Sequence, residues 1–380
     1  MIQRALDIAK LCSPGKTLVV YGPRRSGKTT LLKSFLEASD KRTVLYDGNN
    51  LSAQQLFSTH EYSHLQQAFA GYDVLAIDEA QNIPGIGMSL KIINDQAPAL
   101  IVIATGSSSF DLLGQVGEPL VGRKRTVVLY PFALWELLDD DTTQPSDRFW
   151  KMRYPDLLRY GMYPDSVCAG NDEQRQEFLY ELVDSLLLRD ILMYQEVKGA
   201  KFLIDLLSLL AYQIGSEVSL TELGSSLGIR KETVARYLDL LEKSFIIFRL
   251  GGLSRNMRSE VTRKPKYYFY DVGVRNAIIS NFNRLDRRND GGALWENFAL
   301  VERMKMRAYR PLHANQFFWR TWEKSEIDLV EERDGSYYAY EMKMNPSHQA
   351  TIPAQWLKSY GEEASYEVVT PETLPAFVRY

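Results

Sequence analysis

A glycine-rich loop near the N-terminus has the residue spacing that binds a nucleoside triphosphate. Residues 22–29 read Gly-Pro-Arg-Arg-Ser-Gly-Lys-Thr and fit G-x-x-x-x-G-K-[ST] at every fixed position. The glycines let successive backbone N–H groups point at anionic oxygens. Lys28 is expected to reach the β- and γ-phosphates, and the Thr29 hydroxyl to bind Mg²⁺. The expected nucleotide-binding residues are Gly22, Pro23, Arg24, Arg25, Ser26, Gly27, Lys28, Thr29 and Thr30.

The segments that flank the loop favour this interpretation. Residues 17–21 form a short apolar, β-branched run, and residues 30–37 have helical periodicity. A helix that begins at the loop adds the positive end of its dipole to the phosphate site. A glycine-rich turn with a surface lysine is the alternative, and the order of strand, loop and helix argues against it.

Two carboxylates follow a buried apolar run further along the chain. Residues 72–79 are typical of a buried parallel strand that ends in Asp78 and Glu79. Open α/β sheets bind ligands at that carboxyl edge. Asp78 is expected to hold Mg²⁺ through water, and Glu79 to polarise the attacking water as general base.

Two further positions are candidates for contact with the nucleotide. The apolar run 100–104 ends in Thr-Gly-Ser-Ser, so Thr105 or Ser107 is predicted to sense the γ-phosphate; a helix cap or turn is the alternative. Arg123 follows a Gly- and Pro-rich stretch and could act on the nucleotide in cis or from a neighbouring subunit. A solvated arginine beside a turn is the alternative there.

Composition limits the classes of protein that the chain can belong to. Its 380 residues are 45% hydrophobic and 24% charged, which is typical of globular protein with room for two or three domains. The net charge of −3 gives no sign of a nucleic-acid partner for the chain as a whole. We expect no membrane partner and a cytoplasmic location, because no apolar run approaches ~20 residues and the start lacks a signal-peptide layout. Cys12 and Cys168 have no metal-like spacing.

The first third of the chain alternates strands and helices. We predict an α/β P-loop ATPase core over residues 1–135 with a mostly parallel sheet, whose strands lie at 17–21, 43–47, 73–78, 100–104 and 125–130. An acidic, turn-rich run at 131–146 marks its end. Residues 136–213 are predicted to be a helical lid or connector. Arg189 within it could reach a nucleotide, although a surface ion pair with Asp190 is favoured.

Residues 214–290 have the pattern of a winged helix-turn-helix. A short helix and glycine turn at 219–229 precede an amphipathic helix at 230–243, and 245–250 has the pattern of a wing strand. The second helix is predicted to present Arg230, Lys231, Thr233 and Arg236 outward, as a major-groove reader does. Residues 249–290 hold ten Lys or Arg against four Asp or Glu, with Tyr267, Tyr268 and Tyr270 among them. DNA is therefore the expected partner, and a winged helix used only for packing or for binding protein is the alternative.

Residues 291–380 are predicted to fold as helix, three strands, helix and strand. Asp334-Gly335 is a two-residue hairpin signal between the strands 326–333 and 337–344. A two-residue turn there pairs Asp328 with Glu341 and Glu326 with Lys343, on one face of the sheet. Two opposed carboxylates repel unless a cation or proton lies between them.

A metal site is one interpretation of this pairing. A Mg²⁺ or Mn²⁺ ion would fit between Asp328 and Glu341, with Glu296 contributed by the preceding helix. Lys343 would orient or deprotonate a water, and Glu341 and Lys343 would act in phosphodiester hydrolysis. A charged sheet face of exposed salt bridges is the alternative.

Several stretches together carry a family resemblance. Residues 22–29, Asp78-Glu79-Ala-Gln81, Thr105–Ser108, Leu120–Arg123 and Tyr130-Pro-Phe resemble bacterial and archaeal AAA-type ATPases that carry a C-terminal domain of unknown function. Further similar stretches are 158–164, 189–191, 266–273 and Glu296-Asn297. The C-terminal portion resembles a PD-(D/E)xK nuclease-like fold, whose motif is matched by Glu296, Asp328, Glu341 and Lys343. The resemblance implies a further strand between the strand of the phosphate loop and that of Asp78.

These observations predict a Mg²⁺-dependent ATPase that acts on DNA, in which the ATP state gates a metal-dependent nuclease-like domain. The alternative is a regulatory ATP switch whose C-terminal half is a non-cleaving platform for protein or DNA. ATP, ADP and Mg²⁺ are the expected ligands. Assembly into a homo-oligomer is left open.

Overall fold

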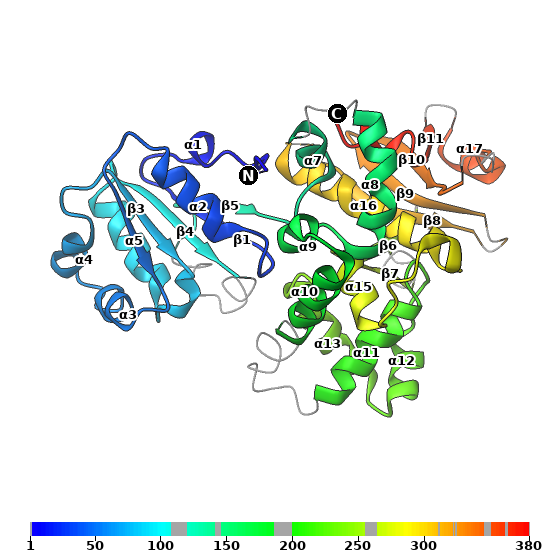
Figure 1. Ribbon diagram of the computed structural model, residues 1–380, viewed down its shortest axis with the longest axis horizontal. Coiled ribbons are helices and arrows are strands. Elements are labelled where there is room, and N and C mark those ends of the chain that lie inside the picture. Colours follow the sequence, from blue (N-terminus) through cyan, green and yellow to red (C-terminus); the bar gives the residue numbers. More distant parts are fainter. Residues whose placement is uncertain are drawn as a thin grey trace. The chain divides into compact units, whose positions relative to one another are not determined.

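The computed structural model describes residues 2–107, 120–140, 146–185, 200–254, 264–310, 312–321, 323, 325–345, 351–361 and 364–379. The chain divides into two compact units, one of Arg4–Pro131 and one of Phe132–Tyr380 with Met1–Gln3. Figure 1 labels their helices and strands.

The first unit contains the predicted parallel sheet. Its five strands lie in the order β2-β3-β4-β1-β5 and all pairs are parallel. Their bounds are β1 Thr17–Tyr21, β2 Thr43–Asp47, β3 Val74–Asp78, β4 Ile101–Gly106 and β5 Lys124–Val128. The predicted α/β class is confirmed. So is the strand expected between those of the phosphate loop and Asp78, because β4 lies between β1 and β3.

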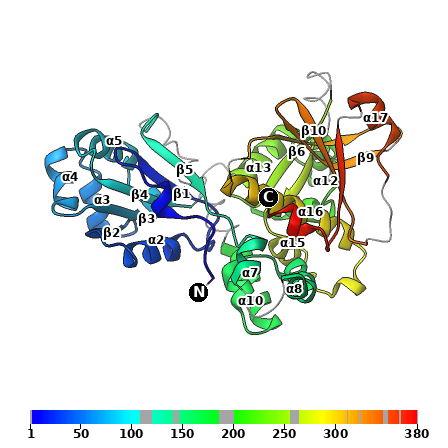
Figure 2. The same ribbon diagram turned by 90° about the horizontal axis from the view of Figure 1, so that it is seen from above.

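Helices cover both faces of this sheet because its central strands are apolar on both sides. Alternate residues such as Val19, Leu75 and Val102 belong to one core, and their neighbours Leu18 and Val74 are equally buried. Figure 2 shows α2 on one face and α5 on the other. The helices are α1 Ile8–Leu11, α2 Lys28–Glu37, α3 Leu51–Phe57, α4 Tyr62–Phe69 and α5 Ile86–Gln96, with a 3₁₀ turn at Ala80–Asn82.

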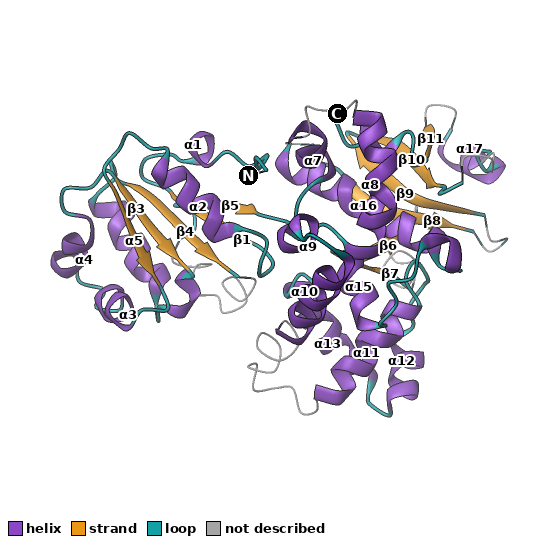
Figure 3. Ribbon diagram, viewed as in Figure 1, coloured by secondary structure: helices purple, strands orange, loops and turns teal. Residues whose placement is uncertain are grey.

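The second unit combines many helices with one mixed sheet (Figure 3). Its helices are α7 Leu134–Asp140, α8 Ser146–Tyr160, α9 Pro164–Cys168, α10 Asp172–Ser185, α11 Ala200–Tyr212, α12 Leu220–Leu227, α13 Lys231–Lys243, α15 Val272–Ile278, α16 Gly291–Tyr309, α17 Ala354–Tyr360 and α18 Leu374–Phe377. Helices α12 and α13 lie where the sequence predicts two helices, and Gly228 ends α12 in the left-handed conformation that glycine favours.

The strand predicted for the wing, at 245–250, belongs to a larger sheet. Six strands lie in the order β11-β10-β9-β8-β6-β7, and β6 pairs antiparallel with β7 and parallel with β8. Their bounds are β6 Ile247–Gly252, β7 Lys266–Phe269, β8 Asn315–Arg320, β9 Glu326–Arg333, β10 Ser336–Met342 and β11 Ser365–Val369. The sheet therefore continues across the boundary predicted at residue 290. The segments 136–213, 214–290 and 291–380 remain predictions about domain organisation.

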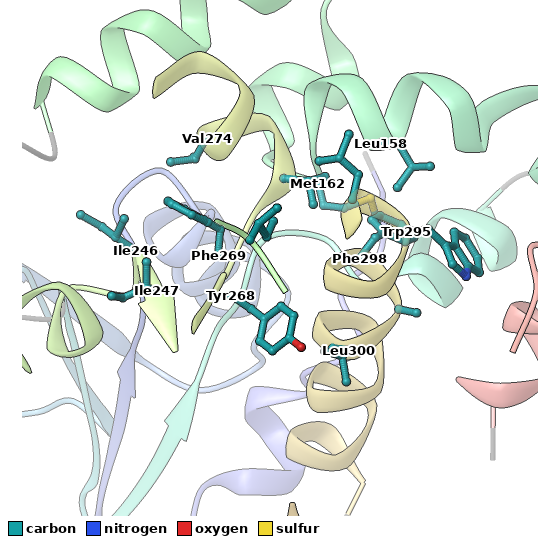
Figure 4. Close-up of a cluster of buried hydrophobic side chains, with 14 of the residues drawn as sticks. Leu158, Met162, Ile246, Ile247, Tyr268, Phe269, Val274, Trp295, Phe298 and Leu300 are labelled. Atoms are coloured by element: carbon teal, nitrogen blue, oxygen red, sulfur yellow. The ribbon is translucent and has the colours of Figure 1, made fainter. Parts of the chain in front are cut away.

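The larger of two hydrophobic clusters among the described residues of the second unit includes much of α16; the other lies around Trp319 and Trp356. Figure 4 shows Trp295 and Phe298 of this helix gathered with Leu158, Met162 and Phe269. Trp150 of α8 stacks on Phe298, with ring centroids 6.1 Å apart. Segments far apart in the sequence thus pack on the helix that carries Glu296.

The hairpin between β9 and β10 has the predicted register. Asp334 and Gly335 both have positive φ, 48° and 81°, as a two-residue primed turn requires. The paired residues run from Arg333 with Ser336 to Leu329 with Tyr340. Asp328 and Glu341 are the next residues on the two strands.

Candidate functional site

The phosphate loop connects the end of β1 to the start of α2. Gly22 has φ 151°, and a Cβ there would overlap the carbonyl oxygen of Leu129. Gly27 caps α2 in the left-handed conformation with φ 95°. Both positions therefore need glycine. Pro23 is buried, whereas Arg25 and Thr30 are exposed and Arg24 is half-buried.

The loop presents two groups suited to phosphate. Lys28 is 5% exposed, and its Nζ donates to the carbonyl oxygens of Gly22 and Pro23 at 3.0 and 2.8 Å. The ammonium thus lies over the loop. Ser26 Oγ is buried without a hydrogen-bond partner among the described residues. A buried hydroxyl of this kind is suited to an acceptor oxygen of a ligand.

The predicted magnesium residues meet at the carboxyl edge of the sheet. The Thr29 hydroxyl donates to Asp78 Oδ2 at 2.7 Å. The Thr105 hydroxyl donates to Asp78 Oδ1 because β3 and β4 are neighbours. A carboxylate and a hydroxyl in contact supply the hard oxygen ligands that Mg²⁺ prefers. The residues present therefore fit a Mg²⁺ ion bound beside the phosphate loop.

Glu79 has an unusual backbone for a non-glycine residue. Its φ is 50° and its ψ 42°, in the left-handed region. Its N–H donates to Thr105 Oγ1 at 3.3 Å, and Gln81 Nε2 donates to its side chain and, at 3.3 Å, to Ser107 Oγ. The strained backbone turns the carboxylate just beyond Asp78, and such strain clusters at functional sites. Ser108 lies outside the described residues.

Two residues that contact the backbone around this site, and not the expected position of the nucleotide, were not identified from the sequence. Arg4 Nη1 donates to the carbonyl of Ser26 at 2.7 Å, and Arg4 Nη2 to that of Tyr130 at 2.6 Å. Gly48 N–H donates to the Asp78 carbonyl at 2.8 Å, and a Cβ on Gly48 would overlap the Glu79 carbonyl oxygen. Neither belongs to a motif, so no sequence signal identified them.

Arg123 lies away from the phosphate loop of its own chain. It directly precedes β5, and its carbonyl accepts from Thr17 N–H at the start of β1. The loop follows the other end of β1, about 16 Å further along a five-residue strand. Arg123 Nε pairs with Asp95 Oδ1 at 2.5 Å. Contact in cis is therefore not supported, and contact from a neighbouring subunit stays a prediction; Arg189 and Asp190 lie outside the described residues.

A second set of acidic side chains meets in the C-terminal sheet. Asp328 Oδ2 accepts from Met342 N–H at 2.7 Å, and Lys343 Nζ lies 2.5 Å from Glu341 Oε1. Glu341 Oε2 is buried and has no hydrogen-bond partner among the described residues. Burial, and then the charge of Asp328, raises the pKa of Glu341 to about 7. Burial also raises the pKa of Asp328.

Glu296 is held by Lys266, a residue of the stretch 249–290 that was predicted to form a basic surface patch. Lys266, whose side chain is 2% exposed, lies 3.3 Å from Glu296 Oε1 and 2.5 Å from Glu326 Oε1. The Tyr268 hydroxyl donates to the same Glu296 oxygen at 2.5 Å. Burial, and then the charge of Asp328, raises the pKa of Glu296 to about 7.

The metal set predicted at Glu296, Asp328 and Glu341 is only partly supported by this geometry. No group of three or more His, Cys, Asp or Glu in the part of the chain that the structure describes is arranged to hold a metal ion. Asp328 and Glu341 offer oxygens to a cation, and the buried Glu341 Oε2 fits one. Glu296 is instead engaged by Lys266 and Tyr268.

The basic patch predicted at 249–290 needs correction. Lys266, Arg275 and Arg288 have buried side chains, and both arginines pair with Asp290. Tyr267 and Tyr268 are buried as well. The count of charges along the sequence therefore overstates the positive surface, because the count does not distinguish internal cations. Among the described residues of α13 and its cap, Arg230, Lys231 and Arg236 are exposed as predicted, and Thr233 is half-buried.

Comparison with known proteins assigns the class of the first unit. Residues 14–138 match an AAA domain, which together with the parallel sheet and phosphate loop defines an AAA-type ATPase. Residues 151–285 and 291–374 match two domains of unknown function. Uncharacterized proteins of Mycobacterium tuberculosis and Mycobacterium bovis are each 30% identical over 332 residues, covering 86% of this chain and 70% of theirs. The chain belongs to the same family of AAA-domain proteins as these mycobacterial relatives.

More distant likenesses add little. An uncharacterized protein of Haemophilus influenzae is 25% identical over 279 residues, covering 69% of this chain and 68% of its own. Among solved structures, a Thermotoga maritima RuvB mutant has a TM-score of 0.29 and 18% identity, covering 62% of this chain and 82% of that one. So low a TM-score supports no functional conclusion. No helix of the described residues is long and apolar enough to cross a membrane, and the cytoplasmic location stays a prediction.

Proposed function

We propose that the chain binds ATP with Mg²⁺ at loop 22–29 and hydrolyses it. The observation that carries the proposal is the meeting of Thr29, Asp78 and Thr105 within hydrogen-bonding distance at the end of the phosphate loop. Bound Mg²⁺ would neutralise charge that develops on the β- and γ-phosphate oxygens. Thr29 and Asp78 would hold it, and Lys28 would exchange its carbonyl partners for phosphate.

Glu79 is the proposed general base. It follows Asp78 directly, and Gln81 and Ser107 form a hydrogen-bonded chain from its side chain. Glu79 would accept a proton from the attacking water, and Thr105 would report the γ-phosphate through its contact with Asp78. Gln81 would be a positioning residue. Its side-chain amide donates to the Glu79 carboxylate and so orients it, and that hydrogen bond does not bring Gln81 to the phosphate.

Two substitutions separate binding from turnover. Lys28→Ala should weaken ATP binding, measured by calorimetry with Mg²⁺ present. Glu79→Gln should leave binding within a few-fold but lower phosphate release by about 100-fold or more, the order expected for loss of a general base. Glu61→Gln, at an exposed helix cap of the same unit, is the control and should match the parent. Retained turnover in Glu79→Gln would remove the base assignment, and absence of ATP binding by the parent would end the proposal.

A second proposed function concerns the C-terminal carboxylates. The buried, unpartnered Glu341 Oε2 beside Asp328 and Lys343 favours a metal-dependent phosphodiesterase acting on DNA and gated by the ATP state. The ion pair between Lys266 and Glu296 favours the alternative of an ATP switch with a non-cleaving platform, because a lysine then occupies the place beside Glu296 that a metal ion would need. Strand cleavage that requires Mg²⁺ or Mn²⁺ and is lost in Asp328→Asn and Lys343→Ala, but kept in Glu332→Gln, would support the first. If the parent shows no such cleavage, the ATP switch with a non-cleaving platform is the remaining proposal.

DNA binding itself is proposed for the exposed face of α13. Replacing Arg230, Lys231 and Arg236 together by glutamine should weaken DNA binding and reduce the salt slope by about one for each phosphate that the variant no longer neutralises. Lys264→Gln, an exposed lysine outside that helix, is the matched control. An unchanged affinity and salt slope would locate any DNA contact elsewhere. Native mass measurement with and without ATP would test assembly into a homo-oligomer.

A further inference from the structure

A short segment, residues 129–136, links the phosphate loop to α16. Its first part follows β5 and lies against the loop: Leu129 N–H donates to the Tyr21 carbonyl at 2.7 Å, and Gly22 leaves no room for a Cβ beside the Leu129 carbonyl. Arg4 joins the carbonyls of Ser26 and Tyr130 through its two Nη atoms. Any movement of the loop therefore acts on residues 129 and 130 directly. We call residues 129–136 the strap.

The other end of the strap is held by a buried ion pair on α16. Lys305 Nζ donates to the Phe132 carbonyl at 2.7 Å and to Glu302 Oε1 at 2.6 Å. Glu302 Oε2 accepts from Leu134 N–H at 2.6 Å. Glu302 and Lys305 are 0% and 1% exposed. Both charges thus bond the backbone of the strap as well as each other.

Holding a chain segment in this way is costly, which suggests a role beyond packing. Moving two charges out of water carries a desolvation penalty that an apolar pair of similar size avoids. Hydrogen bonds to buried backbone groups offset part of that penalty. In return, the pair fixes two backbone positions of the strap, the Phe132 carbonyl and the Leu134 N–H, on α16.

The same helix carries Glu296. Glu302 lies six positions after Glu296, which is about 9 Å along a helix. Glu296 contacts Lys266 and Tyr268, and the charge of Asp328 contributes to its raised pKa. A shift of α16 along its axis, or a small rotation, would therefore move Glu296 relative to the carboxylates of β9 and β10.

We propose that the strap transmits the occupancy of the phosphate loop to α16, with Arg4 as its link to the loop and the Glu302–Lys305 pair as its anchor. The inference rests on the ATP binding proposed above. Phosphate would draw Lys28 away from the Gly22 and Pro23 carbonyls and so alter the loop backbone. Arg4 bonds both the loop and Tyr130 of the strap, and Leu129 of the strap lies against Gly22, so the displacement would reach the strap, and the anchor would pass it to α16. In this arrangement Arg4 is a positioning residue.

Hydrogen exchange on the full chain, with and without a non-hydrolysable ATP analogue and Mg²⁺, tests the proposal. In the parent, the analogue should change exchange at least threefold at the strap amides that include Phe132 and Leu134 and at amides of α16. Arg4→Gln should bind the analogue within a few-fold by calorimetry yet lose the change in α16. Arg125→Gln is the matched control, because Arg125 also donates to a backbone carbonyl, that of Leu11, and it should keep the response.

Three results would overturn the inference. One is an analogue that binds without changing exchange in α16 of the parent, and another is an Arg4→Gln variant that keeps the full change. Both leave the proposed ATPase function standing. The third is absence of nucleotide binding, which removes the ATPase proposal together with this one. If Arg4→Gln folds poorly, Glu302→Gln breaks the opposite end and should likewise keep nucleotide binding and lose the response.

Discussion

Replacing Glu296 by glutamine should make residues 132–380 more stable at about pH 8 and change their stability much less at about pH 5. Burial, followed by the charge of Asp328, raises the pKa of Glu296 to about 7 from its ordinary 4.5. Between these values the folded state keeps a proton that the unfolded state has released. The stabilisation is complete below the unfolded pKa and is lost as the pH rises through the folded one.

The size of the effect follows from the shift. Moving the pKa from 4.5 to about 7 costs the folded state about 3 kcal/mol above pH 7, at about 1.4 kcal/mol per unit. Glutamine removes that cost but also removes one partner of Lys266, which keeps Glu326 at 2.5 Å. We therefore expect a net gain of about 1–3 kcal/mol at pH 8. The pKa of Glu341 is also about 7, so the free energy of unfolding of the variant should still depend on pH, with a smaller slope.

Tryptophan fluorescence is the assay because it reports on one unit alone. All six tryptophans lie after residue 131, at 135, 150, 295, 319, 322 and 356. Urea titrations at about pH 5, 6.5 and 8 would give the free energy of unfolding of that unit for the parent and for Glu296→Gln. Glu332→Gln, at a partly exposed residue of β9, is the control. The reasoning is refuted if Glu296→Gln keeps the full pH slope of the parent, or loses more stability at pH 8 than at pH 5.

Two further predictions concern close packing and buried charge. Gly22→Ala should destabilise residues 4–131 by about 1–3 kcal/mol in a thermal melt and weaken ATP binding, because a Cβ would strike the Leu129 carbonyl. Gly71→Ala, at another glycine of positive φ (81°) where a Cβ meets nothing within 4 Å, should bind ATP normally. Lys266→Met should cost about 3–5 kcal/mol at neutral pH, because Glu296 and the half-buried Glu326 lose the buried cation that they share, and Mn²⁺ should recover part of that loss. Lys264→Met should change stability by less than about 0.5 kcal/mol, and an equal loss in both lysine variants would contradict the role given to Lys266.

Local signals were sufficient to predict the elements and the phosphate loop. Each predicted strand of the first unit overlaps an observed one, because apolar runs flanked by loops specify buried parallel strands. Thr29 and Asp78 meet because Asp78 ends β3 and Thr29 lies in the first turn of the helix to which the loop at the carboxyl end of β1 leads. The Asp334-Gly335 turn fixed the hairpin register for a similar reason, since only residues that tolerate positive φ close so short a turn.

The partners of charged side chains that lie far apart in the sequence could not be predicted in the same way. Lys266 stands in a basic stretch of sequence, yet β7 carries it into contact with Glu296 from a helix thirty residues later. A sum of charges contains no information on which side of a strand a cation points. Arg4 was missed for a related reason, because its two acceptors are backbone carbonyls, which every residue type provides.

The arrangement of the second sheet bears on how any DNA ligand would act. The helix α13 leads directly into β6, and β6 pairs with β8, which pairs with β9. Glu326 and Asp328 lie on β9, so the strand that follows the predicted DNA-reading helix and the strand that carries these carboxylates belong to one hydrogen-bonded sheet. The strap is bonded to Glu302 and Lys305 of α16, and Glu296 of the same helix contacts Lys266 of this sheet. A ligand held by α13 and a nucleotide held by the phosphate loop would then both act on the contacts between this sheet and α16. Linkage requires that each ligand alter the affinity for the other by the same factor.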